Sequence, residues 1–168
     1  MTDKILTPAE AEQALWKHLK GTNVTVMLGL NAPEQHSQPM TAFAEPENNQ
    51  IWFFTRNDLN LAKDAPSSPD ARLIYASKDE EVFADVRGTL VARHDRARIE
   101  KYWGPVVAAW YPDGKNDPHL ILLRFTPLEG QVWVAKAGLL RFVFEVAKAN
   151  LTKSQPDAGG VAEVDFQR

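Results

Sequence analysis

Residues 37–55 read SQPMTAFAEPENNQIWFFT, and this stretch sets the architecture of the chain. Two apolar runs, 39–45 and 50–55, flank the polar turn 46–49, which predicts a β-hairpin. Proline at position 39 gives up its own donor and fixes the chain direction, so we expect the N–H groups of Met40 and Thr41 to aim at a ligand. The aromatic run Trp52–Phe54 suits either a barrel core or a flat aromatic ligand, and composition alone favours the core.

The remaining segments extend this hairpin into a larger β structure. Thr7, Pro8 and Glu10 predict a capping box that begins a helix ending near Gly21. Further strands are predicted at 23–30, 71–77, 82–93, 119–127 and 129–136, with Gly88 as a candidate bulge. Helices are predicted at 56–66, at 96–110 with a bend near Gly104 and Pro105, and at 138–151, followed by a polar tail at 151–168.

Six or seven mostly antiparallel strands with helices at the ends and crossovers predict a mainly β protein. A small closed barrel fits this order, because closure removes the exposed sheet edges. A doubly wound βαβ sheet fits poorly, since helices do not alternate with strands and no glycine-rich loop follows the first strand. We expect a single domain, 1–168, with its core at about 5–150.

Composition narrows the classes of protein and of site. The chain has 168 residues, a formal net charge of −3 and no cysteine, which argues against a nucleic-acid binder and excludes thiolate chemistry. The N-terminus lacks the apolar core of a signal peptide, and no run is long enough to span a membrane, so we expect a cytoplasmic protein. The histidines are scattered, and Asp113, Asp117 and His119 suit a tight turn better than a metal, so no metal site is predicted.

The chain offers no strong set of nucleophilic or proton-transfer groups, and no GxSxG motif is present. Whether it is an enzyme is therefore left open, and any reaction should be carried by a cofactor. A flavin would need an apolar wall for its ring, backbone groups for the polar edge of that ring, and cations or N–H groups for its phosphate. The aromatic residues and strand edges of this chain can supply the first two.

Two motifs resemble a known family. QPM at 38–40 is followed by IWFFT at 51–55, and residues 87–133 read RGTLVARHDRARIEKYWGPVVAAWYPDGKNDPHLILLRFTPLEGQVW. Together they are similar to the general stress protein branch of the flavin-binding split-barrel superfamily of pyridoxamine 5′-phosphate oxidase, over about residues 5–150. The resemblance implies a homodimer of split barrels that holds two FMN molecules at the subunit interface. The sequence itself leaves FAD or a deazaflavin open as the flavin.

The resemblance also implies a set of cofactor-binding residues, with no catalytic residue assigned. These are Pro39, Met40, Thr41, Trp52, Phe53, Phe54, Thr55, Phe83, Trp110 and Trp133. Many relatives place Ser and Lys after the threonine to hold the flavin phosphate, whereas Leu59 and Leu61 stand here. Arg56 or Lys63 is the expected replacement, unless these two are ordinary surface charges.

Trp133 allows two interpretations. In strand alternation it shares a face with Gln131 and Ala135, while Val132 and Val134 point toward the core. An exposed tryptophan there would cover a flavin bound mainly by the second subunit, as the resemblance implies. The alternative is a tryptophan packed under the last helix.

Three functions remain open at this point. The first is an FMN-binding protein of the general stress type, with redox capacity, a flavin-dependent oxidoreductase activity left open, and no assignable substrate. The second is a pyridoxamine or pyridoxine 5′-phosphate oxidase. The missing basic cluster for the substrate phosphate argues against it, with Arg141 as the remaining candidate residue. The third is a non-enzymatic module, either a stress-related partner protein or a small nucleic-acid-binding barrel, and the net charge disfavours nucleic acid.

Overall fold

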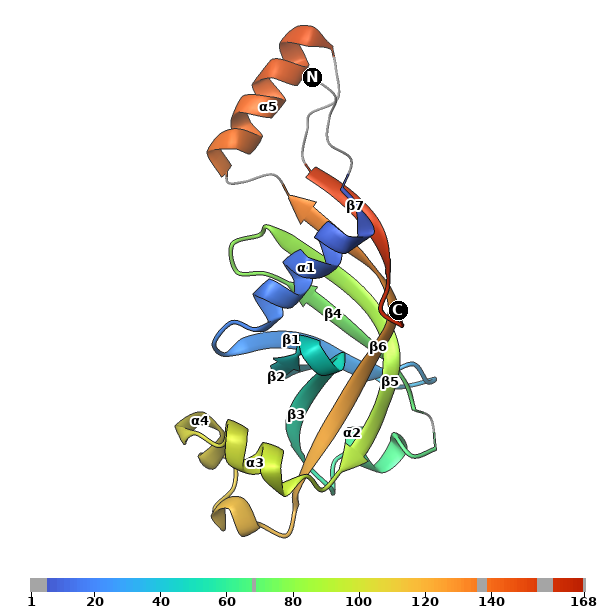
Figure 1. The fold of residues 1–168 in the computed structure, drawn as a ribbon, viewed down its shortest axis with the longest axis vertical. Coiled ribbons are helices and arrows are strands. Elements are labelled where there is room, and N and C mark those ends of the chain that lie inside the picture. The colour runs from blue at the N-terminus through green and yellow to red at the C-terminus, as the bar shows by residue number, and fades with distance from the viewer. Residues whose placement is uncertain (1–5, 68, 136–138, 154–158, 168) are drawn as a thin grey trace.

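A computed structural model describes residues 6–67, 69–135, 139–153 and 159–167, and Figure 1 shows the arrangement of its elements. The strands are β1 Val24–Leu30, β2 Gln38–Glu45, β3 Gln50–Arg56, β4 Asp70–Ala76, β5 Val82–Arg93, β6 Leu120–Ala135 and β7 Gly159–Asp165. The α-helices are α1 Pro8–Leu19, α2 Asn60–Asp64, α3 Arg96–Tyr102, α4 Pro105–Ala108 and α5 Leu139–Thr152. Two short 3₁₀ turns, η1 Pro46–Asn48 and η2 Gly114–Asn116, complete the list.

The seven strands form one antiparallel sheet in the order β3-β2-β1-β4-β5-β6-β7, and an additional β3–β6 pairing closes six of them into a barrel. β6 closes the barrel, because it pairs with β5 along its length and also with β3. Its first half, from Leu120 to Phe125, pairs with β3, and its second half, from Glu129 to Ala135, pairs with β7. The predicted mainly β barrel with peripheral helices is therefore confirmed.

β6 is one strand of 16 residues where the sequence predicts two. The break expected near Pro127 does not occur, because Pro127 lies opposite Gly88 at the point where the β5–β6 register shifts between Arg87 and Gly88. The predicted bulge is confirmed there. A Cβ atom on Gly88 would lie 2.3 Å from the carbonyl oxygen of Thr126 and 2.6 Å from the ring of Phe125, so only glycine lets the strands approach this closely.

The end of the chain differs from the polar tail predicted for it. Residues 159–165 form β7 along the second half of β6, and alternate residues Ala162, Val164 and Phe166 are buried. Phe166 makes an edge-to-face contact with Trp16 of α1, at 6.1 Å between ring centroids. The predicted polar tail is therefore wrong, because a strand covered on one face needs only every second residue to be apolar.

The main core fills the barrel and continues under α1. The capping box is confirmed: the Glu10 backbone N–H donates to the Thr7 hydroxyl, and the Glu10 carboxylate accepts from the Thr7 backbone N–H. α1 then buries Ala11, Leu15, Trp16 and Leu19 on one face. None of the described helices is long and apolar enough to cross a membrane.

A second, smaller core lies on the other side of β3. Its buried members are Trp52, Ile99, Val107, Tyr111, Leu120 and Leu122, which come from β3, β6 and the α3–α4 segment. The predicted bent helix is interrupted at Trp103 and Gly104, giving the separate helices α3 and α4. β3 is thus covered on both faces, with Ile51 and Phe53 toward the barrel and Trp52 and Phe54 toward α3–α4.

Candidate functional site

A cavity of about 710 Å³ opens between β2, the end of β3 and the α3–α4 segment. Its volume falls in the range of small-molecule sites, about 300–1,000 Å³. Its lining is mostly apolar and comprises Asn23, Gln38, Pro39, Met40, Thr41, Phe43, Phe54, Thr55, Arg56, Leu59, Tyr102, Gly104, Pro105, Val106, Val107, Trp110 and Tyr111. The QPM motif at 38–40 and the end of the IWFFT motif at 51–55 therefore line the same cavity.

The cavity exists because β2 and β3 separate. They pair only from Phe43 to Glu45 on β2, opposite Gln50 to Trp52 on β3. Residues 38–42 of β2 pair with β1, and residues 53–56 of β3 pair with β6, so each strand has an edge facing the gap without a strand partner among the described residues. Such edges present backbone N–H and C=O groups to whatever lies between them.

Aromatic rings form the wall beside this gap. Phe43 lies 4.8 Å from Tyr102 and 5.6 Å from Phe54 between ring centroids. Tyr111 is buried below Phe54, and its hydroxyl donates to the carbonyl oxygen of Thr55 at 2.9 Å. Burial raises the pKa of Tyr111 to about 12, so this phenol stays neutral and serves as a wall and a donor.

The mouth of the cavity is apolar and exposed. Trp110 has 75% of its surface exposed, and Val106 and Leu59 are also exposed large hydrophobic residues. Apolar side chains grouped beside a cavity mark a surface that binds a ligand or another chain.

One end of the cavity carries the only full positive charge among its described lining residues, that of Arg56. Its guanidinium donates twice to the Asp58 carboxylate, from Nε to Oδ1 at 3.0 Å and from an Nη to Oδ2 at 2.8 Å. These hydrogen bonds lower the pKa of Asp58. The result is a neutral ion pair at the cavity end.

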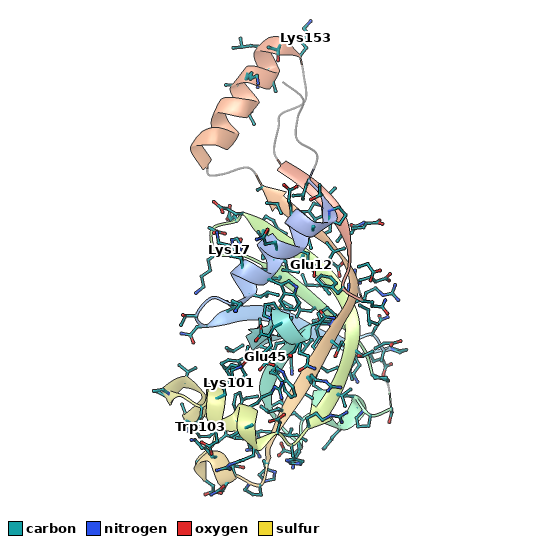
Figure 2. All side chains as sticks on the ribbon, in the orientation of Figure 1. Glu12, Lys17, Glu45, Lys101, Trp103 and Lys153 are labelled. Atoms are coloured by element: carbon teal, nitrogen blue, oxygen red, sulfur yellow. The ribbon has the colours of Figure 1, made fainter. Side chains whose placement is uncertain are left out.

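A charge cluster centred on the buried carboxylate of Glu45 fixes the α3 side of the cavity. Glu45, at the end of β2, is 2% exposed and accepts hydrogen bonds from Arg98 at 2.9 Å, Lys101 at 3.2 Å and the Tyr102 hydroxyl at 2.7 Å. Figure 2 shows Glu45 and Lys101 in the region where α3 meets the barrel. Burial alone would raise the pKa of Glu45, but the hydrogen bonds, led by that from Arg98, outweigh it and hold the pKa at about 2. The cluster thereby orients Tyr102, whose ring lines the cavity.

Comparison with known proteins identifies the family. A family model described as "Pyridoxamine 5'-phosphate oxidase like" matches residues 10–157. The chain belongs to this family. General stress protein 26 of Bacillus subtilis (strain 168) is 25% identical over 113 residues, which are 66% of this chain and 76% of that protein.

Solved structures of general stress proteins place the chain in the general stress branch of this family. A candidate general stress protein 26 from Jannaschia sp. CCS1 superimposes with a TM-score of 0.83 at 33% identity, over 94% of this chain and 99% of that one. The general stress FMN/FAD binding protein from Xanthomonas citri has a TM-score of 0.69 at 35% identity, over 78% of this chain and 93% of that one. The resemblance seen in the sequence motifs is confirmed.

Seven of the residues predicted for a cofactor line the cavity of this pyridoxamine 5′-phosphate oxidase-like chain: Pro39, Met40, Thr41, Phe54, Thr55, Arg56 and Trp110. Three predicted side chains near them do not. Phe53 is fully buried inside the barrel, Trp52 is buried in the second core under Arg98, and Lys63 is exposed on α2. Of the two cations considered for the phosphate, only Arg56 therefore borders the cavity.

Phe83 and Trp133 lie together, away from the cavity lining. They are cross-strand partners in the β5–β6 ladder, and Val161 of β7 lies opposite Trp133 on the other side. Phe83 is 40% and Trp133 39% exposed, while the neighbouring Val132 is fully buried. The alternation predicted for this strand is confirmed, and we call Phe83, Trp133 and Val161 the outer apolar row.

Sequence reasoning missed several lining residues that come from its own motifs. Phe43 is two residues beyond Thr41 on β2 and faces the same side, so strand alternation could have found it. Tyr102 and Tyr111 lie on opposite sides of the α3–α4 break, and their approach to β3 depends on tertiary packing. The side chain of Arg141, named for a substrate phosphate, lies outside the described residues.

Of the three turn residues considered for a metal, Asp117 accepts a backbone hydrogen bond within the turn. Asp117 is buried, and its carboxylate accepts from the His119 backbone N–H at 2.8 Å. Among the described residues, a different group, His18, Asp79 and Glu81, places one potential ligand atom each within 4.8 Å of the others. That group lies outside the cavity lining.

Proposed function

We propose that this chain is a flavin-binding protein of the general stress branch, with the flavin ring in the cavity between β2 and β3. The observation that carries this proposal is the separation of the two strands beside an aromatic wall. A flat ring with a polar edge needs both features at once, because its faces require apolar contacts and its heteroatoms require backbone partners. The relative from Xanthomonas citri is described as FMN/FAD binding, which supports the same ligand class.

The lining residues divide the work of holding FMN, which we propose as the flavin. The unpaired edge of β2 at Pro39 to Thr41 would face the heteroatoms of the ring, and Phe43, Phe54 and Tyr111 would form its wall. Arg56 is the one cationic residue in the described lining that could bind the flavin phosphate. The residues present therefore fit the ring of FMN more fully than they fit its phosphate.

When bound, the flavin would supply electron transfer in one- or two-electron steps. The described lining residues offer little acid–base chemistry of their own. Arg56 stays protonated, and burial raises the pKa values of both Tyr102 and Tyr111. We therefore propose an oxidoreductase in which the protein binds, orients and shields the flavin, with the substrate unassigned. The cysteine-free composition supports a cytoplasmic location.

We further propose a homodimer, because six of the nine exposed large hydrophobic residues in the described part of the chain gather in two separate places. One is the cavity mouth, at Leu59, Val106 and Trp110, and the other is the outer apolar row. A second copy that covers the mouth with its own outer row would bury both at once, and twofold symmetry would repeat the contact. Phe83 and Trp133 would then reach the flavin from the partner.

The test is purification without added cofactor, followed by absorbance spectroscopy, mass spectrometry of any released ligand, and titration of flavin-free protein with FMN. A flavin band or saturable micromolar binding supports the proposal, and its absence in both measurements refutes it. Light scattering at micromolar concentration tests the homodimer separately, since a monomer would remove the covering contact while leaving the cavity unchanged.

A further inference from the structure

The cavity end at Arg56, where the proposed flavin would place its phosphate, has an unusual charge balance. We call it the phosphate end. Arg56 alone among the described lining residues carries a full positive charge. Asp58 occupies one of its two donor edges, the one formed by Nε and an Nη, at 3.0 and 2.8 Å. Asp58 is two residues away in the same turn, so the pair is local to the end of β3. The guanidinium therefore reaches the cavity with its charge already balanced.

A flavin phosphate would either compete for these same donors or be left with the other edge of the guanidinium, which its two Nη groups form. Carboxylate and phosphate both favour the bidentate geometry that Asp58 uses, and only one anion can hold that edge at a time. A phosphate beside this pair would also meet the negative charge of Asp58. Since the pair is partly exposed, with side chains 36% and 43% accessible, water and salt moderate both effects without removing them.

Other sources of positive charge do not reach this end among the described residues. Lys63 is exposed on α2 and does not line the cavity. α2 itself has only five residues. His119 lies 3.9 Å from Asp58, and its Nδ1 contacts the Asn57 side chain at 3.2 Å, so it faces the same turn.

We propose that Asp58 is a specificity-determining residue that makes flavin recognition here nearly independent of the phosphate. This inference rests on the proposed flavin site. The isoalloxazine and ribityl groups supply the affinity, and the cavity accepts unphosphorylated riboflavin almost as well as FMN. Asp58 acts by holding Arg56 and by repelling the incoming dianion.

A double-mutant cycle tests this with two ligands. Flavin-free wild type, Asp58→Asn, Arg56→Ala and the double variant are each titrated with riboflavin and with FMN by fluorescence. Asp70→Asn is the matched control, since it removes one exposed carboxylate at the start of β4, outside the cavity lining. Circular dichroism melts confirm that all five proteins fold alike.

The expected pattern is specific to a charge effect. Wild type binds FMN and riboflavin within about threefold, and Asp58→Asn tightens FMN about three- to tenfold while leaving riboflavin unchanged. Arg56→Ala alone weakens the affinity for FMN only slightly. In the Asp58→Asn background it removes the gain in affinity for FMN. The gain shrinks as salt is raised, and Asp70→Asn reproduces none of it.

Two results would overturn the inference while leaving the flavin site intact. One is wild type that prefers FMN to riboflavin by about a hundredfold and loses that preference in Arg56→Ala, which would show Arg56 already free for phosphate. The other is an Asp58→Asn variant in which the affinities for FMN and riboflavin change equally. That result would show that Asp58 affects only the shape of the site. Failure of every protein to bind either flavin would instead refute the proposed function itself.

Discussion

The guanidinium of Arg98 lies over the indole ring of Trp52, with 4.2 Å between its central carbon and the ring centroid. The same guanidinium donates to buried Glu45 and to Asp95, the residue that caps α3. One side chain thus connects the helix cap, a strand end and the second core. Because α3 carries Tyr102 to the cavity, this connection determines how firmly that wall is held.

Replacing Glu45 by Gln should destabilise the fold. The change removes the counter-charge that Arg98 and Lys101 share. Because Arg98 keeps its ion pair with Asp95 and both cations are partly exposed, a loss of about 1–3 kcal/mol is expected. Urea denaturation followed by tryptophan fluorescence measures the loss. Glu47→Gln is the control, because Glu47 is exposed in η1, two residues after Glu45. A similar loss there would contradict a specific role for Glu45.

The same carboxylate predicts a defined acid sensitivity. The pKa of Glu45 is about 2 in the folded protein against 4.5 without the fold, so its stabilisation is complete above pH 4.5 and is lost as pH falls from there toward 2. The contribution is on the order of 3 kcal/mol. The unfolding free energy should decrease from about pH 6 to about pH 3 in both proteins, because other carboxylates titrate in both. The decrease should be smaller in Glu45→Gln than in the wild type. Equal slopes would mean that Glu45 is not the titrating group.

Trp133→Ala separates a covering role from a core role. On the outer apolar row its loss should change the unfolding free energy of flavin-free protein by less than about 1 kcal/mol, while FMN binding and the proposed dimer weaken. The matched control is Val132→Ala on the same strand, where a fully buried side chain is lost and about 2 kcal/mol of stability with it. A Trp133→Ala protein that melts far earlier yet binds FMN normally would reverse the assignment.

Gly88→Ala tests the strand bulge. The added methyl group would meet the Thr126 carbonyl at 2.3 Å, so the β5–β6 ladder must shift, and a loss of about 1–3 kcal/mol is expected. Gly104→Ala serves as the comparison, because no heavy atom lies within 4 Å of its added methyl group. Melting temperatures of the two variants should differ clearly, and equal values would argue that the bulge can relax.

Local signals in the sequence found the elements whose causes are local. The capping box at Thr7 and the hairpin around residues 46–49 each depend on a few neighbouring residues. The bulge at Gly88 was found from the glycine alone, although its cause is the close approach of β6. β7 was missed because its strand pattern alternates within a polar composition, and its partner, β6, is separated from it by α5.

The aromatic run on β3 shows a limit of another kind. Alternation separates Phe53 from Trp52 and Phe54, but both faces of β3 are buried, so the pattern cannot say which face meets the cavity. Arg56 was named from its charge, yet its neutralisation by Asp58 depends on the turn geometry. The cavity itself arises where two strands stop pairing, and strand register is set by the whole barrel.

The closure of the barrel through β6 also bears on how the chain folds. Strands β1 to β5 can assemble mainly from neighbours in sequence, whereas β3 must wait for a strand that is synthesised after β5, α3 and α4. Closing so long a loop is entropically costly before its contacts form, which slows folding into the millisecond-to-second range typical of barrels. Until then the free edge of β3, with its three consecutive aromatic residues, is exposed to neighbouring chains, so refolding yield should fall as protein concentration rises.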